Sequence, residues 1–343
     1  MATVRIYLPT YRRHGMLGRA LASLRAQTFT DWICEVHNDA PGDPEPARQV
    51  RALGDPRFTL VEHAANLGGT ATFNLFFQPI AEPFYSIHED DNWWAPEFLA
   101  TLLAAAAARP EVVVFWSNMH LAEEQADGSF RPTGRTVWPE TNGGPRSFPW
   151  GQRQQACGAL HSIGAALFRS RPGDDFRIPA VPIGVIEPFR ERLFPHPIVL
   201  VPQPLATFAV TRQTARSRDA GEWAEMQAML AATFFAGATW SEDEVAAFWA
   251  QSRAQRPPAT TALLLATLAQ PAVRSLRRHA RAADWWIVLR GWVRRPGFFF
   301  RLRRSRRRHA DWWRFLETHT AARWRESAAG DEIKTVNDAG IPR

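Results

Sequence analysis

The first 118 residues alternate short apolar runs with segments of helical periodicity, and this alternation restricts the possible folds more than any other feature of the sequence. Strands are predicted at residues 4–8, 32–36, 58–62, 84–87 and 112–116, and helices at 15–27, 47–53, 66–77 and 97–108. Strands joined by helices need right-handed crossovers, which produce a mainly parallel sheet covered by helices. The sequence therefore predicts an α/β fold.

The remainder of the chain divides by composition. Residues 122–152 are rich in Gly, Pro and polar residues and are predicted to form a mobile or substrate-facing segment, with a plain surface loop as the equal alternative. A strand or a helix start is predicted within 160–169, a pair of strands within 198–210, and helices at 222–235 and 242–250. We expect an α/β domain at 1–215, a helical extension at 216–270, a basic amphipathic helical tail at 271–330 and a disordered end at 331–343.

Composition excludes several classes of protein. Hydrophobic residues make up 45% and charged residues 22% of the 343, which is typical of a globular chain and excludes global disorder. The two cysteines, Cys34 and Cys157, form no disulfide framework, which favours a reducing compartment. We find no signal-peptide pattern and no apolar run long enough to cross a bilayer. We therefore expect a cytoplasmic protein, with or without peripheral attachment to the inner face of the plasma membrane.

Three adjacent acidic residues, Glu89, Asp90 and Asp91, directly follow the predicted strand at 84–87. Ligands of parallel α/β sheets bind at the carboxyl ends of the strands. Carboxylate oxygens suit a divalent ion such as Mg²⁺, which takes its other ligands from phosphate and water. The alternative is an acidic helix start, because Pro96 follows and would begin a helix.

Four segments, in order, carry a resemblance to a known family. They are 4–13 (VRIYLPTYRR), 37–43 (HNDAPGD), 66–74 (NLGGTATFN) and 88–97 (HEDDNWWAPE), with a looser match at 162–169. This set resembles the family 2 glycosyltransferases, inverting enzymes with the GT-A fold that use nucleotide-sugar donors. The resemblance extends to about residue 215, and it implies a nucleotide-binding part at about 1–118 and an acceptor part at about 119–215.

The resemblance also assigns roles to individual residues. Around the donor it implies Pro9, Thr10 and Tyr11 beside the nucleotide base with Arg13 nearby, Asn38 and Asp39 on the base, Asn66, Gly68 and Asn74 at the turn and helix start, and Glu89 and Asp90 in the acidic turn. Asp91 matches the last acid of the family's DxD motif, the usual metal ligand. Glu89 stands where that motif has Asp, and it is the second candidate ligand. The implied cofactor is Mg²⁺ or Mn²⁺.

The family's catalytic base is an acid about a hundred residues after the metal motif, and residues 186–193 (IEPFRERL) match that region best. Glu187 would then take the proton of the acceptor hydroxyl. The alternative is an ordinary acid at a helix start, helped by Pro188 and the helix dipole. Asp174 and Asp175 are the other candidates for the base.

The sequence features that indicate acceptor-binding residues are weaker than those of the donor site. His161 lies where family members place acceptor-facing residues, although a buried histidine is the more frequent explanation for such a residue. Trp94 is the aromatic residue that we expect to contact a sugar, whereas Trp93, Trp138 and Trp150 could equally fill the core or a loop. The expected partners are a UDP-, GDP- or dTDP-sugar and a glycan, lipid-linked or other hydroxyl acceptor.

The tail at 271–330 contains sixteen arginines and four acidic residues, so it alone carries a net charge of +12 while the whole chain carries +7. It holds two apolar stripes at helical spacing, one of Trp285, Leu289 and Trp292 and one of Trp312, Phe315 and Leu316. Basic helices with Trp on the apolar side suit an anionic membrane surface. Docking on the catalytic domain and homodimerisation are the alternatives, and no nucleic acid is expected.

Two other functions fit parts of the pattern. A non-catalytic domain that binds nucleotide sugars or glycans could keep this fold after losing the base. A sugar-phosphate nucleotidyltransferase shares the α/β architecture and acidic metal sites, but its basic, glycine-rich phosphate loop is matched here only by residues 12–15. Metal-assisted glycosyl transfer accounts for the largest number of the residues above.

Overall fold

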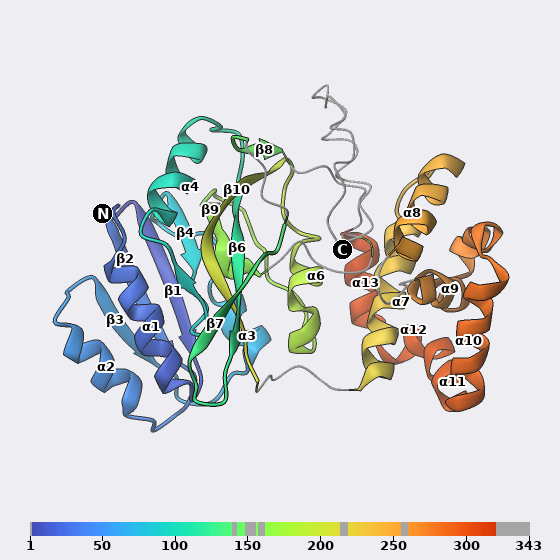
Figure 1. The fold of residues 1–343 in the computed structure, drawn as a ribbon, viewed down its shortest axis with the longest axis horizontal. Coiled ribbons are helices and arrows are strands. Elements are labelled where there is room, and N and C mark those ends of the chain that lie inside the picture. The colour runs from blue at the N-terminus through green and yellow to red at the C-terminus, as the bar shows by residue number, and fades with distance from the viewer. Residues whose placement is uncertain are drawn as a thin grey trace.

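The computed structural model describes residues 2–138, 143–147, 156, 162–212, 219–254 and 260–319. It has two parts, a sheet flanked by helices and a bundle of helices, which lie on the left and right of Figure 1. Each part has its own hydrophobic core. No described helix is both long and apolar enough to cross a membrane.

The sheet contains ten strands in the order β3-β2-β1-β4-β9-β6-β10-β5, with β7 beside β6 and β8 beside β10. The strands are β1 (Val4–Thr10), β2 (Trp32–Asn38), β3 (Phe58–Glu62), β4 (Phe84–Ile87), β5 (Trp93–Trp94), β6 (Val114–Glu124), β7 (Phe130–Thr136), β8 (Arg146–Ser147), β9 (Ala166–Arg169) and β10 (Ile198–Val210). The pairs β1–β2, β2–β3, β1–β4 and β6–β10 are parallel. Because β9 is antiparallel to both β4 and β6, these two strands also point the same way. Six strands therefore share one direction, as the α/β prediction requires.

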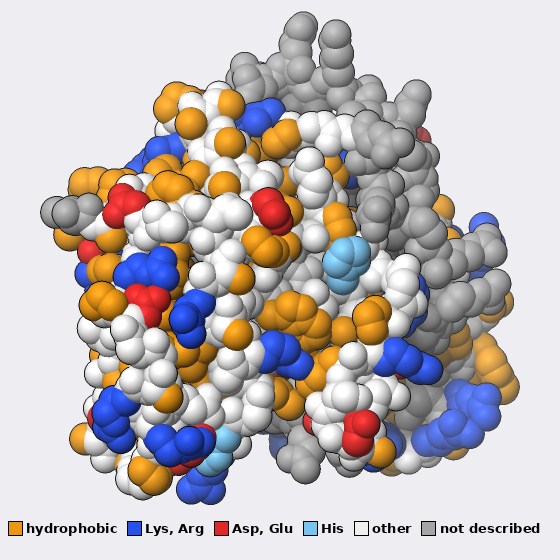
Figure 2. Space-filling model, turned by 60° about the vertical axis from the view of Figure 1, so that its left-hand side comes forward, with side chains coloured by type: hydrophobic (Ala, Val, Ile, Leu, Met, Phe, Trp, Pro, Cys, Tyr) orange, Lys and Arg blue, Asp and Glu red, His pale blue; other side chains and the backbone are white. Residues whose placement is uncertain are grey.

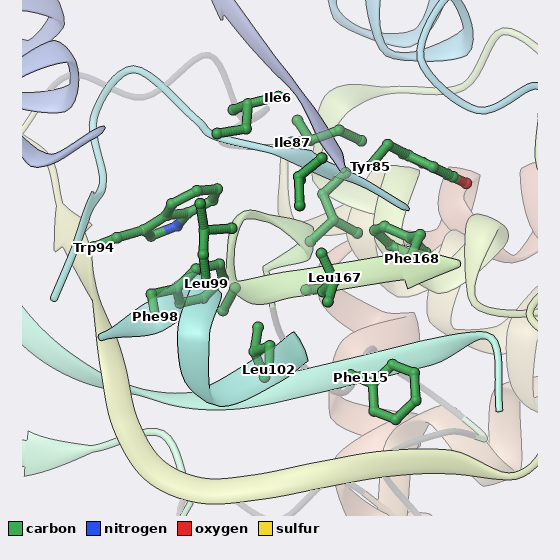
Figure 3. Packing of buried hydrophobic residues seen from close by; sticks show 14 of the residues in the cluster. Ile6, Tyr85, Ile87, Trp94, Phe98, Leu99, Leu102, Phe115, Leu167 and Phe168 are labelled. Carbon is green, nitrogen blue, oxygen red and sulfur yellow. The ribbon is translucent and has the colours of Figure 1, made fainter. Parts of the chain in front are cut away.

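Helices cover the sheet because their apolar faces meet its apolar residues. These helices are α1 (His14–Arg25), α2 (Glu45–Leu53), α3 (Gly69–Asn74) and α4 (Phe98–Ala107). Figure 3 shows Leu99 and Leu102 of α4 packed among Ile87, Phe115 and Leu167 of the strands. On the face in Figure 2, basic and acidic side chains are interspersed, in contrast to the arginine-rich tail.

The structure differs from the prediction in three places. Residues 114–136 form the hairpin of β6 and β7, so the loop predicted from residue 122 is wrong there. The predicted strand pair at 198–210 is the single strand β10, whose register against β6 shifts twice between Val201 and Ala206. Helix α9 (Thr260–Ala269) was missed, because a helix that is buried on nearly all sides has no polar stripe to give it a periodic pattern.

The helical part surrounds α7 (Ala220–Ala236), most of which is buried. Around it lie α8 (Glu242–Ala254), α9, the 3₁₀ segment Pro271–His279, α10 (Ala282–Arg294), α11 (Pro296–Arg303), α12 (Ser305–Arg308) and α13 (Ala310–Thr318). Its core also takes in residues of the sheet part, among them Ile178, Val185, Ile186 and Phe189. The short helix α6 (Ile186–Arg190) therefore lies where the two parts meet.

Candidate functional site

The loops that follow β1, β2 and β4 meet at one edge of the sheet. Thr10 is the residue opposite Asn38 in the β1–β2 register, and its carbonyl accepts a 3.0 Å hydrogen bond from the Asp39 backbone N–H. The Thr10 hydroxyl donates to Asp90 Oδ2 at 2.8 Å. The structure thus brings together three of the predicted site loops at the carboxyl ends of parallel strands, where α/β proteins bind ligands.

Arg13 provides the positive charge of this site. Its guanidinium donates to Asp90 Oδ1 at 3.3 Å and also contacts Asp91 Oδ2. Burial and the nearby charge of Asp91 raise the pKa of Asp90 to about 7, while Arg13 and the Thr10 hydroxyl oppose the rise. Asp90 therefore takes up a proton near neutral pH, and its ionised form is stabilised by Arg13 and the Thr10 hydroxyl.

Arg19 of α1 holds the acidic turn in place, and no sequence pattern predicts this role. Its guanidinium donates to the Asp91 carbonyl at 2.8 Å and lies 4.1 Å from the ring centre of Trp93 and 4.0 Å from that of Phe130. Cation–π contacts of this kind hold a guanidinium in place. Trp93 thus supports the turn through Arg19.

Glu89 connects the acidic turn to the segment that follows residue 161. Its Oε2 accepts hydrogen bonds from the Ser162 hydroxyl and, at 2.8 Å, from Asn92 Nδ2. Gly164 lies so close that a Cβ placed there would be 2.6 Å from the same oxygen. Ser162 lies in the segment of loose family resemblance, but only the fold shows its contact with Glu89.

Asp39 holds the loop between β3 and α3, to which Asn66 and Gly68 belong. Its buried carboxylate accepts from His63 Nδ1 at 2.9 Å, the Leu67 N–H at 2.8 Å, Asn66 Nδ2 at 3.1 Å and the Gly68 N–H at 3.0 Å. A carboxylate has about four lone-pair positions, so these four donors occupy them. The contact of Asp39 with a nucleotide base stays a prediction, and sequence reasoning missed His63.

Two asparagines predicted at the donor serve the scaffold instead. Asn38 is fully buried and bonds Glu62 Oε2, the Asp43 carbonyl and the Ala40 N–H. Asn74 bonds both backbone groups of Ile178 and accepts from Arg190 Nη2 at 2.6 Å. Their amides are therefore occupied by the protein's own groups, and the predicted donor contacts are corrected.

Pro9 and Tyr11 border the same edge of the sheet. Pro9 is the penultimate residue of β1, and Tyr11 directly follows the strand with 46% of its surface exposed. The next residue, Arg12, has φ 56°, a left-handed backbone conformation that strains a residue with a side chain. The backbone thus turns sharply after Tyr11, and the turn brings Arg13 to the aspartates.

Glu187 lies on α6, which is held from both sides. On the sheet side the Thr70 hydroxyl donates to the Val181 carbonyl at 2.8 Å, and the buried Arg190 guanidinium bonds Asn74 and, at 3.1 Å, the Phe176 carbonyl. On the helical side the Phe189 ring stacks on Phe315 of α13. Glu187 itself is half-buried beside Arg190. These contacts on both sides of α6 fix the backbone at Glu187, the candidate base.

Trp94 belongs to the core, so its predicted contact with the acceptor is wrong. It is 2% exposed, stacks on Phe98 at 4.0 Å and donates from Nε1 to the Gly164 carbonyl at 2.7 Å (Figure 3). The backbone N–H of Trp138 donates to Asn118, which places that residue in loop packing. His161 and Trp150 lie outside the described residues.

Within the described ranges, no group of three or more His, Cys, Asp or Glu side chains is arranged to enclose a metal ion. The adjacent carboxylates of Asp90 and Asp91 nevertheless already attract a guanidinium. Mg²⁺ and Mn²⁺ accept one or two protein carboxylates when phosphate and water supply the remaining ligands. The residues present fit an ion bound together with a phosphate ligand, and not an all-protein metal cage.

Comparisons with known proteins agree with this geometry. The sequence profile of the family described as Glycosyl transferase family 2 matches residues 5–160. The Escherichia coli (strain K12) protein "Putative colanic acid biosynthesis glycosyl transferase WcaA" is 30% identical over 102 residues, which are 29% of this chain and 37% of that protein. The match thus spans little more than a third of the relative.

Solved structures resemble the chain over nearly its whole length. Residues 1–349 of S. aureus TarS superpose with a TM-score of 0.57 at 14% identity, covering 95% of this chain and 92% of that one. The complex of the same TarS fragment with UDP-GlcNAc gives a TM-score of 0.54 at 13% identity, with the same coverage. These similarities confirm the predicted GT-A fold with a helical C-terminal part.

Proposed function

Because residues 5–160 match the sequence profile of glycosyl transferase family 2, we propose that this chain transfers a sugar from a nucleotide diphosphate sugar to a hydroxyl acceptor. One observation carries the proposal beyond this match. The aspartates that follow β4 join the end of β1 through Thr10 and the start of α1 through Arg13. This is a charged site at the edge of the sheet where nucleotides bind in such folds.

The donor is a UDP-, GDP- or dTDP-sugar in this proposal, and the TarS fragment crystallised with UDP-GlcNAc supports that class. The exposed ring of Tyr11 lies beside the base, and the loop held by Asp39 borders the donor. Asp91, with Glu89 as the second candidate, holds Mg²⁺ or Mn²⁺ against the diphosphate. When bound, the ion stabilises the negative charge that develops on the leaving diphosphate.

Glu187 is the proposed base, and the transfer inverts the configuration of the sugar. Arg190, one turn further along α6, bonds Asn74 of α3 and the Phe176 carbonyl, and these bonds fix the position of α6 beside α3. A base held by a fixed backbone can take the proton of the acceptor hydroxyl without reorganising. The acceptor is a glycan or a lipid-linked sugar, and the colanic acid biosynthesis relative supports a polysaccharide product.

A direct test is to incubate the purified chain with UDP-, GDP- and dTDP-sugars, with Mg²⁺ or Mn²⁺, and to measure release of nucleoside diphosphate. We expect metal-dependent release from one class of donor. Donor binding without any release, with a range of acceptors present, would favour the non-catalytic binding domain. Release of pyrophosphate from a sugar phosphate and a nucleoside triphosphate would identify a nucleotidyltransferase.

A further inference from the structure

The fold separates the two apolar stripes of the arginine-rich tail. The stripe on α13 docks on the protein, because Phe315 stacks on Phe189, Leu316 is fully buried and Trp312 Nε1 donates to the Ala180 carbonyl at 3.0 Å. The stripe on α10 remains at the surface. The docking alternative therefore applies to α13, and the α10 stripe needs its own explanation.

The α10–α11 face, comprising residues 282–304, collects large exposed apolar side chains. Trp286 is 64%, Val293 72% and Phe300 64% exposed, and Trp285, Ile287, Leu289 and Trp292 are also exposed. A cavity of about 650 Å³ opens among Trp285, Trp286, Leu289, Trp292, Phe300 and Arg303. Contiguous exposed apolar side chains of this kind are typical of interaction sites.

Arginines surround this face, and acidic groups are missing from it. Arg290, Arg294, Arg303 and Arg304 are exposed and form no ion pair in the described part of the chain, whereas Arg295 lies near Asp219 and lowers its pKa. The one acid between residues 282 and 304 is Asp284, which is buried and bonded to Arg253 at 3.0 Å. The face is therefore apolar at its centre and mainly positive around it.

We propose that the α10–α11 face docks on an anionic lipid surface, with its tryptophans at the level of the headgroups and its arginines on lipid phosphates. Trp and Arg together are suited to this interface, because the rings bury apolar area while the guanidiniums stay at the charged layer. A second copy of the chain fits less well. In a two-fold contact the same patch meets itself, so these arginines would face each other without acids between them.

Docking would also orient the proposed active site. The α10 residue Val288, α13 and Phe189 of α6 share one hydrophobic core, so the lipid-facing surface is rigidly connected to the helix that carries Glu187. If the proposed function holds, this connection presents the base to an acceptor on lipid. The docking itself depends only on the face and can be tested without activity.

The test uses the full chain with vesicles of phosphatidylcholine, pure or mixed equally with phosphatidylglycerol. Cosedimentation should occur with the mixed vesicles, be weak with pure phosphatidylcholine and fall as salt is added. The double variant Trp286→Ser, Val293→Ser should lower the partition coefficient about tenfold or more. Arg290→Gln and Arg294→Gln should lower it about fivefold each. Both apolar side chains are exposed, so circular dichroism should show an unchanged fold.

Trp223→Ser is the matched control, because Trp223 is 42% exposed on α7 and lies outside the α10–α11 face. It should bind vesicles like the wild type. Two results would overturn the proposal: vesicle binding that survives the Trp286 and Val293 changes, or absence of binding by the wild type. A dimer seen by sedimentation without lipid, and lost in the double variant, would assign the face to a second copy instead.

Discussion

Arg13 Nη1 lies against both aspartates of the turn after β4, 3.3 Å from Asp90 Oδ1 and in direct contact with Asp91 Oδ2. The site thus carries its own cation, supplied by the first residues after β1. A divalent ion that binds Asp91 must share that carboxylate with Arg13 or displace it. Arg13 is then available for the donor's phosphates, to which guanidinium groups bind well.

Replacing Arg13 by Gln should increase the affinity of the free protein for Mn²⁺ about fivefold or more, because a competing positive charge is removed from a partly buried site. Titration calorimetry at about pH 8.5 measures this, above the pKa of about 7 that Asp90 has in the wild type. Arg25→Gln, an exposed change on the same helix, should leave Mn²⁺ binding as it is. Equal or weaker Mn²⁺ binding in Arg13→Gln would show that Arg13 does not compete with the ion.

Replacing Gly164 by Ala should displace Glu89 and so disturb the acidic turn. The new Cβ would lie 2.6 Å from Glu89 Oε2 and 3.1 Å from both Asn92 Nδ2 and Ser162 Oγ, so Glu89 must move. We expect a loss of stability of about 1–3 kcal/mol, measured by urea unfolding, and weaker metal-dependent donor binding. Gly143→Ala, with nothing within 4 Å of its Cβ, is the control. Unchanged donor binding in Gly164→Ala would show that Glu89 does not contribute to donor binding.

Replacing Glu187 by Gln should slow transfer about a hundredfold or more and leave the dissociation constant of the donor unchanged, because only the proton acceptor is removed. Single-turnover rates and donor titrations measure the two quantities separately. Comparable turnover in the variant would move the base to another residue.

His88 makes folding stability depend on pH. It is fully buried between Ser23 and Trp94, and burial lowers the pKa of its imidazole to about 3. The unfolded chain binds this proton below about pH 6.5, whereas the folded protein does not, so the stabilisation is complete above that pH and is lost as the pH falls. The expected loss from this residue is about 1.4 kcal/mol per pH unit.

Urea unfolding between about pH 7.5 and pH 5 measures how the free energy of unfolding changes with pH. His88→Asn should remove the contribution of one proton from this pH dependence. His196, whose ring nitrogens are buried and whose pKa is lowered to about 2, keeps its own contribution in this variant. An identical slope in the variant and the wild type would mean that His88 is protonated in the folded state.

The strand ends could be predicted from sequence, because buried parallel strands have continuous apolar runs and polar residues follow directly. The aspartates at 90 and 91 were found this way, whereas Thr10 was assigned by the resemblance to the family 2 glycosyltransferases. The directions of side chains could not be predicted. Trp93 and Trp94 are neighbours in β5, so they point to opposite sides, and only the sheet register puts Trp94 in the core.

The role of Asp39 was missed for a related reason. Its four donors come from His63 and the loop at 66–68, which lie 24 to 29 residues further along the chain, and local patterns carry no information on such pairing. The same holds for Glu89 and Ser162, which are 73 residues apart. The limit of prediction from sequence is clearest in the tail. Its two apolar stripes have similar sequences, and only packing distinguishes the docked α13 from the exposed α10.

The central claim is that the carboxylates after β4 hold a divalent ion against the diphosphate of the donor. The most direct measurement is the affinity of the nucleotide sugar for wild type and Asp91→Asn, each with Mn²⁺ and with a chelator. We predict that Mn²⁺ strengthens binding to the wild type about tenfold or more, and that Asp91→Asn binds with the weak, chelator-level affinity in both conditions. A variant that keeps the full gain from Mn²⁺ would contradict the claim.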